Sequence, residues 1–300
     1  MAEHVWFVTA CSSGFGRAIA FSALRRGHKV IATARDSSKL SELRDAGAAV
    51  MDVDVTSDDA TLAAKLAQAN AVFGSITHVV NCAGYILEGA IEEASNKEVF
   101  DQFNTNVFGT FNIARVATKY LRAAAAAAGE GSRRRRTALA TFGSLGSWQS
   151  GAAVAHYCST KFAVSGLTEG LADELKPFGI DVCVIEPGYT RTGFLARDDN
   201  NSHRIQTAKR LAVYEGTPAA ALRDAMEAYD GKQPGSVEKS AELIVDVLTG
   251  EGVGEGRPVP VRLVLGADAV EAVRRKCLET LALVEAWEAV GRASAGVGEF

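Results

Sequence analysis

The chain alternates between short runs of consecutive apolar residues and longer segments in which apolar residues recur every three to four positions. The consecutive runs are typical of strands buried on both faces, and they predict strands at residues 5–9, 30–33, 50–55, 77–81, 137–142, 181–185 and 261–265. The periodic segments predict helices at residues 17–26, 58–71, 99–128, 155–175, 237–248 and 269–289. Because strands that alternate with helices form parallel sheets, we expect an α/β fold in which helices flank a doubly wound, mainly parallel, seven-stranded sheet.

Two segments interrupt this alternation. Residues 123–136 begin with an alanine run and end in four arginines, Arg133 to Arg136, and we expect a surface loop insert with a solvated tip there. Residues 193–235 are long, polar and irregular, and such a segment within an α/β domain is either disordered or functional. Its position after the sixth strand favours a substrate lid. We otherwise expect a single domain over residues 1–300.

Composition and charge argue against several classes of protein. The net charge of −4, with 47% hydrophobic and 23% charged residues, fits an ordinary globular domain and argues against a nucleic-acid surface. No run approaches the ~18 apolar residues of a membrane span, and the first residues lack the basic and apolar regions of a secretory signal. The five cysteines are scattered without zinc-site spacing, so we expect reduced thiols, no metal and a cytoplasmic location.

A small, glycine-containing turn follows the first predicted strand. Residues 10–16 read ACSSGFG, and with the helix and strand that follow they form a β-turn-α-β unit of ~30 residues. Backbone N–H groups at the start of a helix attract a pyrophosphate, and glycines let the backbone approach it closely. Two glycines in a turn are equally compatible with a plain tight connection.

The other polar and turn-forming motifs also stand where strands are predicted to end. They are Arg35, Asp54, residues 81–84, Ser144 and residues 187–192. In a doubly wound sheet, ligands bind outside the carboxyl ends of the strands. The convergence of these motifs predicts a dinucleotide site of the Rossmann type, and it is stronger evidence than any single motif.

Tyr157 and Lys161 lie four residues apart in the helix predicted at residues 155–175. This spacing places both side chains on one helix face, about 5–6 Å apart at Cβ. An ammonium group there favours the phenolate and draws the tyrosine pKa toward neutrality, which suits a general acid or base. Composition alone supplies such a pair in roughly one chain in five, so a tyrosine beside a solvated lysine is the alternative.

These motifs together resemble those of the short-chain dehydrogenase/reductase family, over nearly the whole chain. Residues 9–16 resemble its TGxxxGxG turn, except that Ala10 replaces the first glycine. Residues 81–84 resemble its NNAG motif with cysteine in second place, and residues 157–161 match its YxxxK motif. Residues 187–192 resemble its PGxxxT segment beside the nicotinamide.

Further positions extend the resemblance. Asp54 and Val55 resemble the pair that touches the adenine ring, Asn106 stands at the helix position of the catalytic asparagine, and Ser144 precedes Tyr157 by the family's spacing. Among subgroups, the arrangement looks most like the hydroxysteroid- and retinol-dehydrogenase-like reductases. Arg35 and residues 265–269 support that subgroup more weakly.

The resemblance implies four catalytic residues. Tyr157 would exchange a proton with the substrate oxygen, and Lys161 would lower the tyrosine pKa and hold the nicotinamide ribose. Ser144 would bind and orient the substrate oxygen, and Asn106 would hold a water that connects Lys161 to solvent. The alternatives are a strand-end cap for Ser144 and a structural helix amide for Asn106.

The resemblance also implies a cofactor site. Its expected members are Ser12, Ser13, Gly14, Phe15, Gly16, Arg35, Asp54, Val55, Asn81, Ala83, Gly84, Tyr157, Lys161, Pro187, Gly188, Thr190 and Thr192. Ala10 raises a question about this site, because the first glycine of the turn often needs a backbone conformation that is costly for a residue with a Cβ. Either the turn is altered or the position is not strained.

Charge at the end of the second strand distinguishes NAD from NADP. NAD sites need a carboxylate there for the ribose 2′-hydroxyl, whereas NADP sites need a nearby arginine. Ala34 stands in the carboxylate's position and Arg35 follows, and a guanidinium can bind a 2′-phosphate through two hydrogen bonds. We therefore expect NADP(H), although Asp36 could turn toward a hydroxyl or neutralise Arg35.

The function implied is an NADP(H)-dependent oxidoreductase of the carbonyl reductase type, which transfers a hydride between nicotinamide and a ketone or secondary alcohol of an apolar substrate. Residues expected to line the substrate pocket are Tyr85, Ile86, Leu145, Trp148, Tyr189 and Phe194, although ordinary packing explains any one of them nearly as well.

Two alternatives keep the fold and the cofactor. The site could perform isomerisation, elimination or cyclisation without net redox change, or the protein could be a non-catalytic NADP-binding sensor. The complete catalytic set argues against the sensor. The resemblance also implies a homodimer or homotetramer that forms through the helices predicted at residues 99–128 and 155–175.

Overall fold

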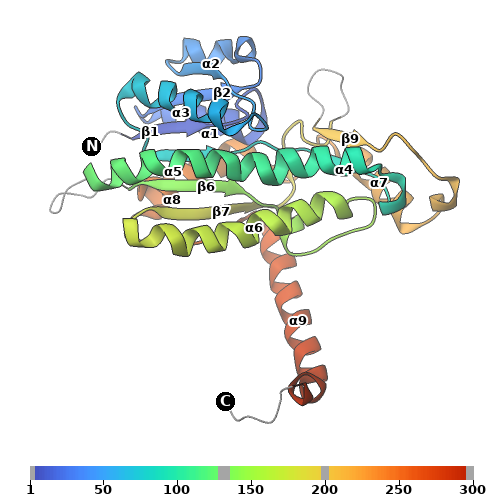
Figure 1. Cartoon of the computed structure of the whole chain (residues 1–300). Coiled ribbons are helices and arrows are strands. Elements are labelled where there is room, and N and C mark those ends of the chain that lie inside the picture. Colours follow the sequence, from blue (N-terminus) through green and yellow to red (C-terminus); the bar gives the residue numbers. More distant parts are fainter. Residues whose placement is uncertain (1–3, 128–135, 197–202, 295–300) are drawn as a thin grey trace.

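Seven parallel strands form the central sheet, in the order β11-β7-β6-β4-β1-β2-β3 (Figure 1). The computed structural model describes residues 4–127, 136–196 and 203–294. The strands are β1 (Val5–Val8), β2 (Lys29–Ala34), β3 (Ala49–Asp52), β4 (His78–Asn81), β6 (Ala138–Phe142), β7 (Asp181–Pro187) and β11 (Arg262–Leu265). The predicted seven-stranded α/β fold is confirmed, and every pair in this sheet is parallel.

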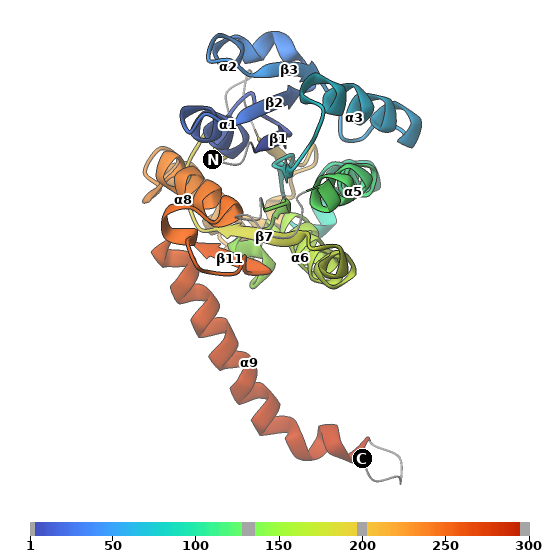
Figure 2. The same cartoon turned by 90° about the vertical axis from the view of Figure 1, so that its left-hand side faces the viewer.

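Helices cover both faces of the sheet (Figure 2). One face carries α1 (Gly14–Arg25) and α8 (Val237–Thr249), and the other carries α3 (Asp59–Phe73), α5 (Thr110–Ala127) and α6 (Ala155–Leu175). Successive side chains of a strand point to opposite faces. Trp6 and Val8 therefore join the core beneath α1 and α8, while Phe7 joins the core beneath α3 and α5. This double burial explains why the strands are apolar throughout.

Short sequence signals set several helix boundaries. The Asp58 side chain accepts a hydrogen bond from the Thr61 backbone N–H at 2.8 Å and so caps α3. Gly74, in the left-handed conformation, ends that helix. Ser95 and Glu98 form a reciprocal capping box at the start of α4 (Asn96–Phe103).

The long helix predicted at residues 99–128 is interrupted. It consists of α4, a π-helical turn (Asn104–Gly109) and α5. Apolar periodicity does not reveal such a turn, because one inserted residue shifts the phase only slightly. π-Helical turns are frequent at functional sites, and this one contains Asn106.

Several short elements were not predicted. They are α2 (Ser41–Asp45), β5 (Ile86–Glu88), β8 (Thr190–Arg191), β9 (Arg204–Gln206), α7 (Pro218–Tyr229) and β10 (Gly235–Ser236). Strand β5 pairs with β9, and β8 pairs with β10, in two small parallel sheets apart from the main one. Each partner lies dozens of residues away along the chain, so the local pattern carries little signal of these strands.

The two predicted insertions are only partly described. Residues 123–127 form the last residues of α5, with Ala124 and Ala125 buried, and residues 128–135 lie outside the described ranges. Arg136 is described, and its guanidinium donates to the carbonyl of Val247 at 2.9 Å. Residues 197–202 of the predicted lid, with its Asp-Asp-Asn-Asn run, also lie outside these ranges.

The last helix, α9 (Ala267–Ala293), follows β11 and extends away from the body of the protein (Figures 1 and 2). Within the described ranges, none of the helices combines the length and apolar character that crossing a membrane requires.

Candidate active site

A cavity of about 320 Å³ opens at the carboxyl edge of the main sheet. The predicted site residues in its lining are Ser13, Gly14, Phe15, Gly16, Gly84, Ile86, Ser144, Leu145, Tyr157, Lys161, Pro187, Gly188, Tyr189, Thr190, Thr192 and Phe194. The other predicted site residues are not part of this lining: Ser12, Arg35, Asp54, Val55, Asn81, Ala83, Tyr85, Asn106 and Trp148. The parallel register explains why these residues from distant parts of the sequence meet at one edge of the sheet. Val8 pairs with both Ala32 and Val80, which aligns the ends of three strands.

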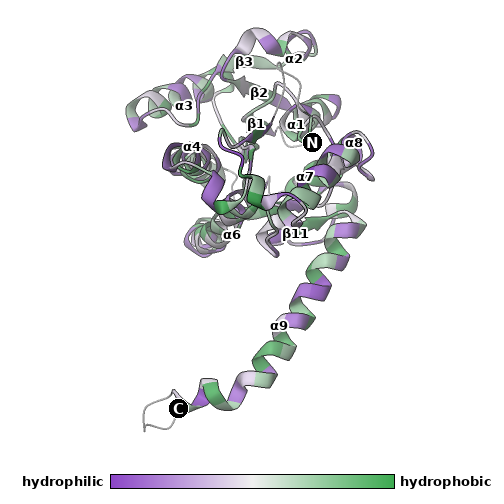
Figure 3. Cartoon of the chain, turned by 90° about the vertical axis from the view of Figure 1, so that its right-hand side faces the viewer, coloured by the Kyte–Doolittle hydropathy of each residue, from purple (hydrophilic) through white to green (hydrophobic). Residues whose placement is uncertain are grey.

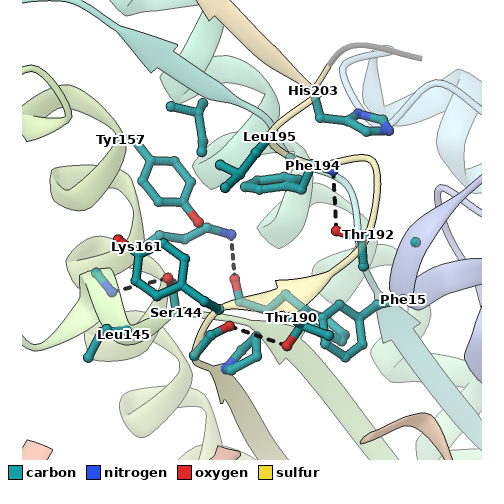
Figure 4. A pocket seen from close by; sticks show the side chains of 18 of the residues that line it. Phe15, Ser144, Leu145, Tyr157, Lys161, Thr190, Thr192, Phe194, Leu195 and His203 are labelled. Atoms are coloured by element: carbon teal, nitrogen blue, oxygen red, sulfur yellow. Dashed lines mark hydrogen bonds between the residues drawn. The ribbon is translucent and has the colours of Figure 1, made fainter. Parts of the chain in front are cut away.

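Tyr157, Lys161 and Ser144 lie together at one wall of this cavity (Figure 4). Tyr157 and Lys161 come from the same face of α6, and their residues are only 9% and 4% exposed. The Lys161 ammonium lies 5.7 Å from the centre of the Tyr157 ring and donates to the carbonyl of Phe142 at 2.7 Å. Ser144 follows β6, and its hydroxyl accepts from the Gly146 backbone N–H at 3.0 Å. Lys161 is therefore not a solvated surface lysine.

Burial controls the protonation of the pair. It raises the pKa of the Tyr157 phenol above its usual value, and a hydrogen bond with Ser144 opposes that rise only in part. Burial also lowers the pKa of Lys161 to about 8. The expected shift of the tyrosine pKa toward neutrality is therefore not found in the protein alone, where burial is the largest cause of the shift and raises the pKa. At neutral pH Tyr157 carries its proton.

Asn106 lies in the π-helical turn and is buried. Its Oδ1 accepts from the Tyr85 backbone N–H at 3.0 Å, and its Nδ2 donates to the Tyr85 carbonyl at 2.9 Å and to the Thr160 hydroxyl at 3.0 Å. Three of the four hydrogen-bonding positions of the amide are thus taken. Asn106 fixes the loop after β4 against α6, and its role in holding a water stays a prediction.

Gly84 lies where this loop meets Asn106 and Lys161 of α6. A Cβ built on Gly84 would lie 3.2 Å from Asn106 Oδ1 and 3.6 Å from Lys161 Nζ. A side chain there would press on both groups. The glycine lets the loop pass close to the lysine.

The glycine-containing turn keeps its left-handed conformation even though alanine replaces the first glycine. Ala10 has a φ of 54°. Neither of the two possibilities that the sequence left open holds: the turn is retained, and Ala10 bears a strain that costs a residue with a Cβ roughly 1–2 kcal/mol. Gly16 cannot be replaced in the same way, because a Cβ there would lie 2.5 Å from the Ala10 carbonyl oxygen.

The charged side chains that follow β2 and β3 differ in their contacts. Arg35 is exposed, and within the described part of the chain no ion pair is recorded for it. Asp36 instead accepts from the backbone N–H of Ser38 at 3.0 Å and from its hydroxyl at 2.6 Å. Asp36 therefore does not neutralise Arg35 in this structure. Asp54 accepts from both the backbone N–H and the hydroxyl of Thr56.

The far wall of the cavity comes mainly from residues that the sequence analysis missed. They are Gln149, Ser150, Val154, Cys158, Leu195, His203, Leu222, Met226 and Gln233. The Phe194 ring lies 6.0 Å from the Tyr157 ring and 6.1 Å from the His203 ring, and His203 Nε2 shares a 2.9 Å hydrogen bond with Ser13 Oγ. The segment after β7 thus reaches from Tyr157 to the glycine turn (Figure 4). Its irregular sequence offers no periodic signal of these contacts.

A buried carboxylate explains why Trp148 lies outside the lining. The indole N–H of Trp148 donates to Glu186 at 2.8 Å, and the Arg262 guanidinium stacks on the indole at 3.9 Å. Glu186 is fully buried, and it also accepts from Ser165 at 2.8 Å and pairs with Arg262. This network ties the loop after Ser144 to β7, β11 and α6. In the sequence, this network was indicated by the charged residue Glu186, which ends an apolar strand just before Pro187.

One group of possible metal ligands lies at the opposite end of the sheet. Among the described residues, His4, His28 and Glu251 place ligand atoms within 4.8 Å of one another. The indole N–H of Trp6 donates to His28 Nδ1 at 3.1 Å, and burial lowers the His28 pKa, so the neutral ring carries its proton on Nε2. Neither ring nitrogen of His28 then offers a free lone pair, and we assign no metal to this group.

Comparisons with known proteins agree with the fold. Residues 4–203 match the family model described as short chain dehydrogenase. The chain is 35% identical to the oxidoreductase calM of Penicillium decumbens, over 92% of this chain and 88% of that protein. It is 33% identical to a 3-ketodihydrosphingosine reductase of Bacteroides thetaiotaomicron, over 65% of this chain and 66% of that protein.

A solved structure gives the same result over the full length. The crystal structure of a short-chain dehydrogenase from Streptomyces avermitilis superposes with a TM-score of 0.83 at 31% identity, covering 99% of this chain and 100% of that one. The chain therefore belongs to the short-chain dehydrogenase/reductase family of oxidoreductases.

Proposed function

We propose that this protein is an NADP(H)-dependent carbonyl reductase that acts on a ketone, or the corresponding secondary alcohol, of an apolar substrate. One observation carries the proposal. A protonated Tyr157, Ser144 and Lys161 share one wall of an apolar cavity that continues to the glycine turn.

The residues present fit a nicotinamide dinucleotide. Ser13, the N-cap of α1, makes no side-chain capping bond, so the first N–H groups of the helix remain available to a pyrophosphate. Lys161 uses one N–H on Phe142, and its other hydrogens are available to ribose hydroxyls. The exposed Arg35 after β2 suits a 2′-phosphate. These features support NADP(H).

The protonation states favour the reductive direction. The bound nicotinamide would supply or accept the hydride. Tyr157, which holds its proton because it is buried, would donate that proton to the carbonyl oxygen. Ser144 would hold the same oxygen, and the Lys161 charge would stabilise the phenolate that remains.

The cavity wall supports an uncharged, apolar substrate. In the described lining, Lys161 is the sole lysine or arginine. Arg204 and Arg223, which lie close behind, are buried and paired with Glu88 and Glu93. Among the described lining residues, a substrate carboxylate or phosphate would thus meet no lysine or arginine other than Lys161. The name of one relative, a 3-ketodihydrosphingosine reductase, supports a ketone as the substrate.

The test follows NADPH absorbance with purified protein across a panel of apolar ketones and aldehydes. We expect Tyr157→Phe to lower kcat by about 10²–10⁴-fold while NADPH still binds. Tyr120→Phe, at a half-buried tyrosine of α5 outside the cavity lining, is the matched control and should change kcat little. Tight NADPH binding without turnover of any carbonyl would favour the sensor, and product formed without net NADPH consumption would favour the non-redox alternative.

Exposed aromatic residues support the expected homo-oligomer. Phe100, Phe108 and Phe162 are 60%, 50% and 46% exposed on α4, the π-helical turn and α6. Large apolar side chains grouped on neighbouring helices are typical of protein–protein contacts. Association through these helices would cover them.

A further inference from the structure

His203 lines the cavity but belongs to none of the motifs that resemble those of the family. Its Nε2 lies 2.9 Å from Oγ of Ser13, the N-cap residue of α1. Its ring also stacks on Phe194, with the two ring centres 6.1 Å apart (Figure 4). The contact between His203 and Ser13 therefore joins the segment after β7 to the glycine turn, across 190 residues of chain.

The backbone at His203 is held in place. Its carbonyl accepts a hydrogen bond from the Ile86 backbone N–H at 2.7 Å, and β9 begins at the next residue and pairs with β5. Arg204, the first residue of β9, is 3% exposed and pairs with the buried Glu88 at 3.1 Å. Figure 1 shows β9 and α7 at one end of the main sheet, and Figure 3, which looks onto that end, shows α7 in front of it. A histidine held in this way can bind a ligand at little cost in conformational entropy.

The other side of this contact is the start of α1. The first N–H groups of a helix attract an anion, and Ser13 makes no side-chain capping bond to them. The segment after β7 lies against this turn at a second point, because a Cβ built on Gly14 would lie 3.9 Å from the Thr192 Cβ. His203 and Thr192 thus both approach the position that suits the cofactor diphosphate.

A diphosphate at this position requires hydrogen-bond donors and positive charge. Among the described residues of the lining, Lys161 and His203 are the two whose side chains can carry a positive charge. Lys161 donates to the Phe142 carbonyl beside Tyr157, whereas His203 lies at the glycine turn. An imidazole offers one N–H when neutral and two when protonated. Hydrogen bonds from such a group to a phosphate are of the strong, charge-assisted kind.

We propose that His203 is a cofactor-binding residue, whose imidazole N–H donates to a phosphate oxygen of the dinucleotide beside Ser13 and the first N–H groups of α1. This assignment rests on the proposed function for the presence of a dinucleotide. Ser13 and His203 bond each other in the structure, and the diphosphate would accept hydrogen bonds from both. Because the same segment places Phe194 against the Tyr157 ring, a bound diphosphate would also fix the cavity wall that faces the substrate.

Two substitutions separate the donor from the ring. His203→Phe keeps a ring that can stack on Phe194 but removes the donor, whereas His203→Gln removes the ring and keeps an N–H donor. The readout is the affinity for NADPH and for NADH, followed by nicotinamide fluorescence, and it requires no turnover. We expect His203→Phe to weaken both cofactors about tenfold, because both carry the diphosphate, and His203→Gln to stay within about threefold of the unaltered chain.

Ile205→Ala is the matched control. Ile205 is 47% exposed on β9 and lies outside the cavity lining, so its substitution should change neither affinity. Unfolding temperatures measured alongside show whether each variant remains folded. Equal affinities of His203→Phe and the unaltered chain overturn the proposal. A gain in affinity also overturns it, since the imidazole would then compete with phosphate for Ser13.

Two further outcomes would contradict the assignment. A loss confined to NADPH would place His203 at the 2′-phosphate, and an equal loss in His203→Phe and His203→Gln would mean that the imidazole acts through packing. Absence of carbonyl turnover bears on the proposed reductase activity and leaves the affinity result standing. The two failures are therefore distinguishable.

Histidine resonances test the contact directly. In a chain with isotope-labelled histidine, the His203 signals are identified by their loss in His203→Phe. Saturating ADP, which carries a diphosphate without the nicotinamide, should shift these signals, whereas adenosine should not. His4 and His28, at the opposite end of the sheet, are internal references whose signals should stay unchanged. A His203 signal that ADP leaves in place overturns the proposal.

Discussion

Replacing Ala10 by glycine should stabilise the protein. Ala10 holds a φ of 54°, a conformation that costs a residue with a Cβ roughly 1–2 kcal/mol and costs glycine nothing. Glycine makes the unfolded chain more flexible, which offsets about 0.4–1 kcal/mol of that gain. We therefore expect Ala10→Gly to raise the free energy of unfolding by about 0.5–1 kcal/mol, and the unfolding temperature by about 1–3 °C.

An alanine-to-glycine change within α1 should instead lower the free energy of unfolding. Ala18 lies within α1, where glycine destabilises a helix by roughly 0.5–1 kcal/mol relative to alanine. Guanidinium unfolding of both variants, followed by tryptophan fluorescence at one protein concentration, compares them directly. If Ala10→Gly lowers the free energy of unfolding as Ala18→Gly does, the turn is not left-handed and the reasoning fails.

Cofactor affinity provides a second readout of this variant. Because the alanine already holds the turn in the conformation that a glycine would adopt, NADPH affinity should change by less than about threefold. A tenfold gain would mean that Ala10 distorts the turn and that binding corrects the distortion.

Three further predictions concern charge. As pH rises through about 8, Lys161 loses its proton and kcat/KM for carbonyl reduction should fall, whereas residual activity of Lys161→Arg should be flat over that range. Glu186→Gln should lower the free energy of unfolding by roughly 2–4 kcal/mol in urea titrations, since it removes the buried one of the two carboxylates that pair with Arg262. Glu169→Gln, on the exposed side of the same arginine, should cost less than about 1 kcal/mol. Arg35→Ala should raise the NADPH KM roughly 10–100-fold and leave the NADH KM unchanged, with Arg44→Ala as the exposed control; equal effects on both cofactors would exclude Arg35 as the 2′-phosphate contact.

The main sheet could be predicted because its signals are local. A strand covered on both faces must be apolar throughout, and the helices between strands show their own period. Strands β5 and β9 carry no such signal, since each is three residues long and is stabilised by the other across more than 100 residues of chain. The cavity wall built on Leu195, His203 and Met226 was missed for the same reason.

The sequence by itself determined the α/β class, the set of strand-end motifs and the helical spacing that joins Tyr157 to Lys161. These follow from backbone geometry and from the burial that each segment requires. Only the tertiary structure decided how the motifs act together. It showed that burial is the largest cause of the raised pKa of Tyr157, and that Ala10 keeps the turn at the expense of strain. Desolvation and backbone strain depend on everything packed around a residue, and no local pattern records that environment.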